Sequence, residues 1–392
     1  VKQEGSGTLT LSATNSYEGG THVNAGTLAI STDRNVGAVP ASFDADNISL
    51  NGGTLQFTTG FTTLHANRGI TLVGNSTLST DESVSVNYAG VIAGTGGLTK
   101  SGSGTLTLSN AQTHTGTTTV SGGALNVGDG SNTTSALGAN SISIGTGASL
   151  NFNHSADVTV ANAIGGAGAL NKLDTHTLTL TGVSSYTGAT GTGTGTAGGV
   201  VYTHDTAPTT SGFTGSGTVT IQPATTSFGS LVIGNYNFAN TLSSLTLGKA
   251  GNLTNLTLNS LVDIAGPITL YAPTITLNGG RISTTGGQTY NGAVMLGVNT
   301  TLSSTASGDI TFNSTLNGDK TLAIQTSGIT TFNGSVGNTT ALTSLTTDAG
   351  TAGSVAINGG MVNTTGAQSY GEAATLGAAT ALTSTGAGAI TF

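Results

Sequence analysis

Apolar and polar side chains alternate over short stretches along the whole chain. Apolar residues stand two positions apart, with a polar residue between them, at Leu9/Leu11, Ile48/Leu50, Leu55/Phe57, Ile142/Ile144, Leu150/Phe152, Val158/Val160, Ile268/Leu270 and Ile275/Leu277. A period of two places one face of a strand inside and the other face in water. Runs such as Asn51-Gly52-Gly53 supply residues that tolerate the backbone angles of turns. The pattern predicts an all-β protein, and we find no amphipathic helix in it.

One longer pattern occurs three times in the first half of the chain. Each copy has a Thr-Leu-Thr-Leu strand, then Tyr or His eight residues after the first Leu, then Gly two residues further on; the copies start at Thr8, Thr105 and Thr177. In the first two copies another Leu follows the first after 19 residues, as Leu28 follows Leu9. The third copy keeps the first part of the pattern and then continues as Gly-Thr dipeptides.

The second half repeats with a different period. The segments that begin at Leu277 and Ile357 align without gaps, so that they are 80 residues apart. Within this unit a shorter motif recurs after 20 residues, with Phe312 and Phe332 in equivalent places. Because 80 is four times 20, both periods fit one structural repeat of about 20 residues.

A period near 20 is too short for a globular domain and suits one turn of a β-solenoid, in which short strands joined by turns form a rung. We therefore expect a parallel β-solenoid with roughly 20–22 residues per rung and about 18 rungs. A single rung cannot bury its apolar face alone, so the stability comes from stacking on the neighbouring rungs. Like charges would stack at strand spacing and repel, which explains why few charges occur.

Composition narrows the possible functions. Only 6% of the 392 residues are charged, with 8 Lys and Arg against 16 Asp and Glu, whereas an ordinary soluble domain has roughly 25%. The net charge of −8 argues against nucleic acid as a partner, since phosphate binding needs clustered Lys and Arg. The chain has no Cys for disulfides or thiolate metal sites, and no apolar run is long enough to span a membrane. We expect it to be a fragment whose export signals lie elsewhere.

The sequence suggests three parts. Residues 1–190 form a β-helix segment with the three strand repeats, residues 191–235 an irregular or low-complexity transition, and residues 236–392 a β-helix segment with the 80-residue repeat. Gly-Thr dipeptides and two prolines interrupt strand pairing in the transition. Tyr202, His204 and Asp205 lie there, and we name them as a weak ligand or loop site, because loops that project from a scaffold often bind ligands. An irregular exposed turn is the alternative.

Candidate catalytic and metal-binding groups are scattered. Asp44 and Asp46 share a face in a strand and could hold calcium or flank a sugar, and Asp81 with Glu82 is a similar pair. His154 near Asp157, and His204 beside Asp205, lack a third metal ligand or a paired nucleophile. We therefore assign no catalytic residue, no metal and no cofactor, and expect no enzyme activity.

The first copy, Gly5-Ser6-Gly7-Thr8-Leu9-Thr10-Leu11 through Asn15-Ser16-Tyr17-Glu18-Gly19-Gly20-Thr21 to Asn24-Ala25-Gly26-Thr27-Leu28, resembles the autotransporter-associated β-strand repeat of bacterial passenger domains. The second copy matches equally well. The third has Asp174-Thr175-His176 in place of Gly-Ser-Gly, which leaves its turn uncertain, although a lysine precedes each copy, at Lys2, Lys100 and Lys172.

Residues from about 238 to 392 contain motifs such as Gly-Ala-Gln-Ser-Tyr-Gly, and this stretch is similar to the tandem repeats of large filamentous-haemagglutinin-like exoproteins. These resemblances imply secretion, a right-handed parallel β-helix, and a role in adhesion or surface coating. They imply no catalytic residue.

We therefore expect an extracellular structural or adhesive β-solenoid, a stalk or passenger segment of a protein that is secreted or held at the bacterial outer membrane. The first alternative is a direct adhesin that contacts glycans or proteins of a host or neighbouring cell, or associates with itself. A β-helical polysaccharide-active enzyme is the second alternative, and an ice-binding surface of Thr-X-Thr arrays is the third. No segment is expected to span a membrane, and no nucleic acid is expected as a partner.

Overall fold

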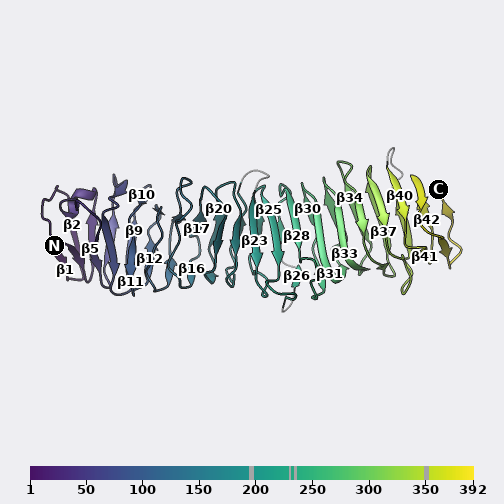
Figure 1. Cartoon of the computed structure of the whole chain (residues 1–392), viewed down its shortest axis with the longest axis horizontal. Coiled ribbons are helices and arrows are strands. Elements are labelled where there is room, and N and C mark those ends of the chain that lie inside the picture. The colour runs from purple at the N-terminus through teal and green to yellow at the C-terminus, as the bar shows by residue number, and fades with distance from the viewer. Residues whose placement is uncertain (194–197, 229–230, 234–235, 348–352) are drawn as a thin grey trace. The chain divides into compact units, whose positions relative to one another are not determined.

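The computed structural model describes residues 1–193, 198–228, 231–233, 236–347 and 353–392. Two compact units divide the chain: Val1–Thr194 with Pro208–Thr210, and Gly195–Ala207 with Ser211–Phe392. In both units every named strand pairs in parallel with strands of the neighbouring rungs (Figure 1). Among the described residues the single helical element is the 3-10 turn η1 (Asp33–Val36). The predicted all-β fold, a parallel β-solenoid, is confirmed.

The first unit winds through three sheets and a fourth, shorter strand pair. The first sheet contains β1 (Lys2–Gln3), β3 (Thr21–Val23), β5 (Asp44–Leu50), β8 (Arg68–Leu72) and β11 (Ile92–Gly94). The second sheet contains β2 (Thr8–Leu11), β4 (Thr27–Ile30), β6 (Thr54–Phe57), β9 (Ser76–Thr80), β12 (Leu98–Ser101), β14 (Thr118–Val120), β16 (Ile142–Ile144) and β19 (Ile164–Gly166). The third sheet contains β7 (Thr63–Leu64), β10 (Ser85–Tyr88), β13 (Thr105–Leu108), β15 (Ala124–Val127), β17 (Ser149–Phe152), β20 (Ala169–Lys172) and β22 (Thr190–Gly191). The remaining pair is β18 (Val158–Val160) with β21 (Leu178–Leu180).

The second unit is built in the same way. Its largest sheet contains β23 (Gly199–Thr203), β25 (Thr218–Gln222), β28 (Ser244–Leu247), β31 (Ile268–Leu277), β33 (Gln288–Leu296), β35 (Ile310–Phe312), β38 (Ile329–Phe332), β40 (Ser354–Ile357) and β43 (Ala373–Leu376), with β26 (Leu231–Ile233), β29 (Leu256–Leu258) and β36 (Leu316–Asn317) joined beside them. Another sheet contains β30 (Val262–Ile264), β32 (Arg281–Thr284), β34 (Thr300–Ser304), β37 (Thr321–Thr326), β39 (Ser344–Thr347), β42 (Gln368–Tyr370) and β45 (Ile390–Thr391). Two shorter pairs are β24 (Gly212–Thr214) with β27 (Asn237–Phe238), and β41 (Met361–Thr364) with β44 (Ala381–Ser384).

Strand register explains the periods in the sequence. Leu9 in β2 pairs with Leu28 in β4, so the separation of 19 residues is one rung. Phe312 in β35 pairs with Phe332 in β38, so the separation of 20 is also one rung. The period of each sequence repeat therefore corresponds to a whole number of rungs.

Some rungs are longer than expected. Leu28 in β4 pairs with Leu55 in β6, which is 27 residues further along the chain rather than 20–22. The additional residues between these strands include η1 and the segment that leads into β5. An excursion at a corner lengthens a rung without changing its strand register, because the ladder depends only on the strands.

The core of each unit is a column of stacked apolar side chains. In the first unit Leu28, Leu55 and Leu78 pair in register on β4, β6 and β9, and each is at most 1% exposed. In the second unit Tyr290 and Phe312 stack with ring centroids 4.9 Å apart, and Phe312 and Phe332 follow at 5.3 Å. Thr and Ser occupy the alternate, outward positions of the same strands, as the period of two predicts.

The transition predicted at residues 191–235 contains strands β22 to β26 in part or in full. Residues 194–197, 229–230 and 234–235 of that segment lie outside the described residues. The division of the sequence into 1–190, 191–235 and 236–392 stays a prediction.

Candidate functional site

The three residues predicted as a loop site do not face solvent together. Tyr202 lies in β23, is 3% exposed and packs edge-on against Phe213 with ring centroids 5.9 Å apart. His204 and Asp205 follow in a turn, where Asp205 accepts hydrogen bonds from the backbone N (2.9 Å) and the hydroxyl (3.1 Å) of Thr225. These bonds, the backbone one first, hold the pKa of Asp205 below its usual value. A ligand site here stays a prediction, and His204 and Asp205 are its accessible part.

The carboxylate pairs suggested by the sequence are occupied by local hydrogen bonds. Asp44 accepts from the backbone N of Asp46 at 3.3 Å and from the side-chain amide of Asn47 at 3.1 Å. Asp46 accepts from the hydroxyl of Thr71 at 2.8 Å. Over the described ranges, no group of three or more His, Asp and Glu side chains is arranged to hold a metal ion. These carboxylates brace the start of β5, and nothing in their geometry favours calcium.

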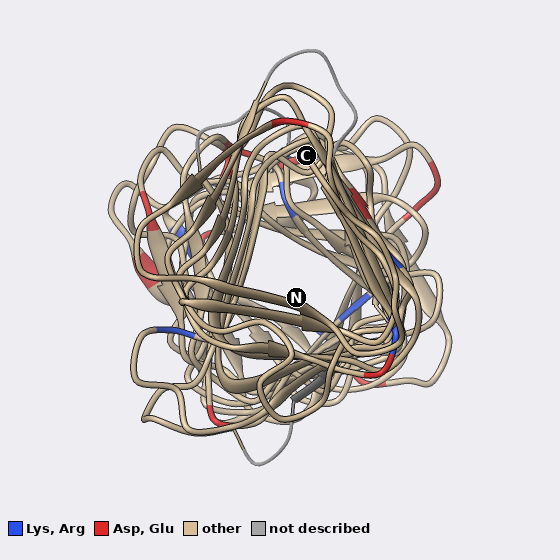
Figure 2. Cartoon of the chain, turned by 90° about the vertical axis from the view of Figure 1, so that its right-hand side faces the viewer, with Lys and Arg blue, Asp and Glu red and all other residues tan. Residues whose placement is uncertain are grey.

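Asp81 and Glu82 lie beside a shallow surface groove lined also by Thr59, Ser83 and Ser103. Asp81 accepts a hydrogen bond from the side-chain amide of Gln56 at 2.7 Å. Figure 2 shows charged residues on turns as well as on strands. No described helix is long and apolar enough to cross a membrane.

A serine and a histidine that the sequence did not connect lie together in the first unit. The Ser135 hydroxyl lies 2.9 Å from Nε2 of His154, and both residues are 1% exposed. Nδ1 of His154 is buried without a partner, and Asp174 accepts from the backbone N of His154, not from its ring. A nucleophile buried to this degree cannot meet a polymer substrate, so the pair is a core contact. The two residues are 19 positions apart, one rung, which is the signal that could have predicted their contact.

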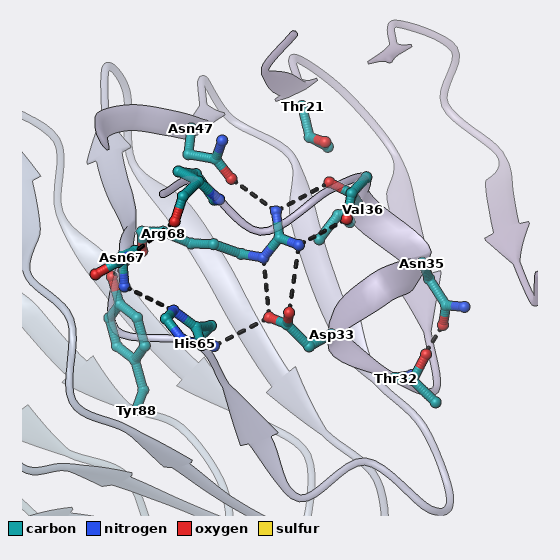
Figure 3. Close-up of polar contacts among 12 residues, drawn as sticks. Thr21, Thr32, Asp33, Asn35, Val36, Asn47, His65, Asn67, Arg68 and Tyr88 are labelled. Carbon is teal, nitrogen blue, oxygen red and sulfur yellow. Dashed lines mark hydrogen bonds and ion pairs between the residues drawn. The ribbon is translucent and has the colours of Figure 1, made fainter. Parts of the chain in front are cut away.

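A buried polar cluster surrounds Arg68, which is among the largest fully buried side chains of the described residues (Figure 3). The side chain of Arg68 is 0% exposed, yet each of its N–H groups has a hydrogen-bond acceptor. Nε and one terminal nitrogen donate to the carboxylate of Asp33 at 2.9 and 3.3 Å, and the other bonds go to Asn47 Oδ1 and to the carbonyls of Val36 and Gly37. The guanidinium thus fastens η1 to the first sheet. Fork geometry of this kind is what Arg provides and Lys does not.

A buried lysine of β12 reaches into the turn of the second repeat copy. Nζ of Lys100 lies within hydrogen-bond distance of four backbone carbonyls, those of Ser101 (2.9 Å), Gly102 (3.1 Å), Gly104 (2.9 Å) and Gly122 (3.0 Å), which share its three N–H groups. Its side chain is fully buried. Burial lowers the pKa of Lys100 to about 8, so the ammonium form still predominates at neutral pH.

The other two copies close the same turn in related ways. In the first copy the donor is Gln3 and not Lys2: its side-chain amide bonds to the carbonyls of Gly5 and Gly7 at 2.9 Å each. In the third copy Lys172 donates to the carbonyl of Asp174 and lies 3.5 Å from its carboxylate. That carboxylate also accepts from the backbone N of His176 at 2.8 Å. The turn left uncertain by the sequence is therefore closed by an aspartate in place of glycine.

A second contact recurs in all three copies. The polar atom of the aromatic residue meets the hydroxyl of a threonine four positions later: Tyr17 and Thr21 (2.9 Å), His114 and Thr118 (2.8 Å), Tyr186 and Thr190 (2.6 Å). This clasp joins the segment between strands to the start of the next strand. It gives a physical reason for the fixed offset of eight from leucine to aromatic residue.

The 80-residue repeat carries its own buried network. The side-chain amide of Gln288 donates to the carbonyl of Ser303 (2.9 Å) and accepts from the hydroxyl of Tyr290 (2.8 Å). Eighty residues later, Gln368 donates to the carbonyl of Thr383 (2.8 Å) and accepts from Tyr370 (3.0 Å). The repeat thus preserves a polar network inside the coil as well as the apolar pattern.

On the surface of the second unit, asparagine amides form a ladder. Asn313 donates to Asn291 Oδ1 at 2.8 Å, Asn333 to Asn313 at 2.9 Å, and Asn358 to Asn333 at 2.9 Å. Asn313, Asn333 and Asn358 are exposed. An amide has two donor hydrogens and two acceptor lone pairs, so each interior member keeps one of each for solvent or a partner.

Comparison with known proteins supports the resemblance drawn from the sequence. The family model of the passenger-associated-transport-repeat matches residues 2–30 and 98–127, which are the first two copies. The adhesin BmaC autotransporter of Brucella suis biovar 1 (strain 1330) is 39% identical over 94 residues, which cover 24% of this chain. That aligned stretch is about 2% of the length of the adhesin. No solved structure matches the chain.

These similarities favour a location outside the cell, secreted or at the bacterial surface in association with the outer membrane. They agree with the parallel ladder of each unit and with the turn and clasp contacts that recur in the copies. In two stretches, residues 2–30 and 98–127, the chain is thus similar to the repeats of autotransporter passenger proteins.

Proposed function

We propose that this segment is a stalk within a longer surface-exposed passenger, which carries adhesive parts away from the outer membrane and has no catalytic activity. The observation that supports this most directly is the parallel ladder of each unit, whose interior is filled by stacked apolar side chains and closed polar networks. Every added rung lengthens such a coil by about 4.8 Å. A stalk needs length and stiffness, and this construction supplies both.

The chemistry of the described side chains supports a non-catalytic role. The Ser135–His154 pair is buried, and the carboxylates of Asp44 and Asp46 already accept hydrogen bonds, from within β5 and from Thr71 on β8 respectively. Glycoside hydrolysis needs two carboxyl groups that flank an accessible substrate. We expect no product release from a panel of polysaccharides.

The stalk can be tested by replacement within the full-length passenger. An unrelated β-solenoid with the same number of rungs should restore cell adhesion when it replaces residues 1–392, whereas simple deletion should shorten the passenger and weaken adhesion. Loss of adhesion with the replacement solenoid present would show that this segment binds the target itself.

A direct adhesin is the second candidate, and the exposed amide ladder favours it. Repeated donors and acceptors at strand spacing could hydrogen-bond the hydroxyls of a surface glycan or a protein of a host or neighbouring cell. Replacing Asn313, Asn333 and Asn358 together by Ala should then abolish saturable binding on a glycan array. In the first unit the buried Asn151 bonds in the same way to Asn126 and Asn171, so Asn151→Ala is the control for loss of an amide contact that is not exposed. Unchanged cell aggregation and array binding in the triple variant would remove this candidate.

A further inference from the structure

The four carbonyls around Lys100 form a cage that a stalk or an adhesive surface does not by itself require. Three of the oxygens come from one turn, those of Ser101, Gly102 and Gly104, and the fourth comes from Gly122 in the following rung. None of the ion pairs among the described residues involves Lys100. The positive charge is therefore held by backbone dipoles alone.

The glycines of this turn keep the cage compact. Gly102 has a φ of 73°, in the left-handed region, and a Cβ atom there would collide with the carbonyl oxygen of Thr80. A residue with a side chain would have to move the backbone and with it the oxygens that meet at Nζ. A Cβ on Gly104 would likewise collide with the carbonyl oxygens of Asp81 and Val84, so both glycines of Gly-Ser-Gly are explained by the close approach of the preceding rung.

We propose that Lys100 is the built-in cation of a carbonyl cage that locks two successive rungs together, and that this cage has the chemistry of a site for ammonium or potassium. Rings of backbone carbonyls replace the hydration shell of large, weakly hydrated monovalent cations, as in selectivity filters. Divalent cations prefer carboxylates, and the ion pairs among the described residues give the cage none. The spacing of 2.9 to 3.1 Å is that of an ammonium donor.

The other copies show what the charge adds. Gln3, a neutral donor, bonds to two carbonyls of its own turn. Lys172 shares its charge with Asp174. In the second copy the ammonium also reaches Gly122, so the charge bridges between rungs in addition to closing the turn.

The test is chemical rescue of Lys100→Ala in the full chain. Removing the side chain should lower the thermal unfolding midpoint by several degrees and increase hydrogen exchange at residues 102–104 and 122–124. Ammonium or potassium chloride should restore most of the loss, whereas tetramethylammonium chloride at the same ionic strength should not, because that cation is too large for the cage.

Two matched variants separate the cage from simple packing. Lys100→Met fills the same space without donors, so it should lose stability and resist rescue. Lys100→Gln imitates Gln3 and should lie between wild type and the Met variant. If Lys100→Ala does not fold, NMR of the wild-type side chain decides the question: slowly exchanging Lys100 ammonium protons at neutral pH support the cage, and fast exchange overturns it. Equal stabilisation of Lys100→Ala and Lys100→Met by ammonium would also overturn it.

Discussion

At the scale of single residues, this chain uses its few charges inside the coil as well as outside. Arg68 and Lys100 are both 0% exposed; Arg68 bonds to backbone carbonyls and polar side chains, and Lys100 bonds to backbone carbonyls alone. Burying a charge is tolerated only when its partners replace the lost water. In a protein with 6% charged residues, such positions are structural fasteners rather than a solvated surface.

Arg68→Met should destabilise the first unit by about 3 kcal/mol, toward the lower end for a broken buried ion pair, because Asp33 keeps some contact with water. The reason is that Asp33 and the carbonyls around it lose their donors while the loop stays packed. Urea unfolding followed by far-ultraviolet circular dichroism measures the change. Arg68→Lys keeps the charge but loses the fork, and should recover only part of the stability. The double variant with Asp33→Asn should cost less than the two single changes added together; simple additivity would contradict the coupling.

His114 should make the first unit sensitive to acid. The side chain is 0% exposed, and burial lowers its pKa, so the folded protein resists protonation that the unfolded chain accepts near pH 6.5. Stability contributed by the neutral form is therefore complete above that pH and is lost as the pH falls below it. Unfolding midpoints measured from about pH 7.5 to about pH 5 should decline less in His114→Tyr, because a tyrosine phenol ordinarily ionises only near pH 10, well above this range. Identical slopes for both proteins would contradict this account.

How far the sequence predicts these residues depends on their spacing. The apolar columns follow a period of two within strands and of about 20 between rungs, so they can be recognised from the sequence alone. The contact of Arg68 with Asp33 does not follow from these periods, because Asp33 lies 35 positions away, beyond an excursion that breaks the period. Tyr202 was placed in a projecting loop, although Val200 and Tyr202 already show the alternation of a strand with a buried face.

At the scale of elements, each repeat copy forms a corner between two sheets, and the two sheets it joins differ from copy to copy. In the first copy the turn joins β1 of the first sheet to β2 of the second sheet, and in the second copy it joins β12 of the second sheet to β13 of the third. In the third copy it joins β20 of the third sheet to β21. The same motif therefore serves different edges of the coil. It can do so because its contacts, the turn cap and the aromatic clasp, stay within one or two rungs.

The aromatic column of the second unit is the element whose loss should be most costly there. Phe312 lies between Tyr290 and Phe332, with rings nearly parallel, and is 0% exposed. Phe312→Ala should lower the free energy of unfolding by about 3 to 5 kcal/mol, since a large cavity would remain in a column that cannot collapse. Near-ultraviolet circular dichroism of the tyrosines reports on this region, because the chain has no Trp. Phe312→Leu, which fills more of the space, is the control and should lose clearly less; equal losses would argue against cavity formation.

At the scale of the whole molecule, the sequence predicted the fold class better than any site. The periods of 19, 20 and 80 arise from rung stacking, which is a property of the entire chain and leaves its trace at every repeat. A ligand-binding surface has no such periodic pattern in the sequence, because exposed Thr and Asn are compatible with contact to solvent, a glycan or a protein alike. The amide ladder became visible only when the register placed Asn313, Asn333 and Asn358 next to one another.

Because each rung contacts only its neighbours, a local defect should spread by steps along the ladder and not through the entire chain. In Phe312→Ala, hydrogen exchange should rise most in β33 and β38, which pair directly with β35, and less in β31 and β40, one step further along. Strands of the first unit such as β6 should exchange as in the wild type, since their ladder contains different rungs. Mass spectrometry of peptides after timed exchange measures this gradient. A uniform rise in exchange over all peptides would mean that the chain unfolds as one cooperative body, and the description of its stability as a sum of neighbouring rung contacts would then be wrong.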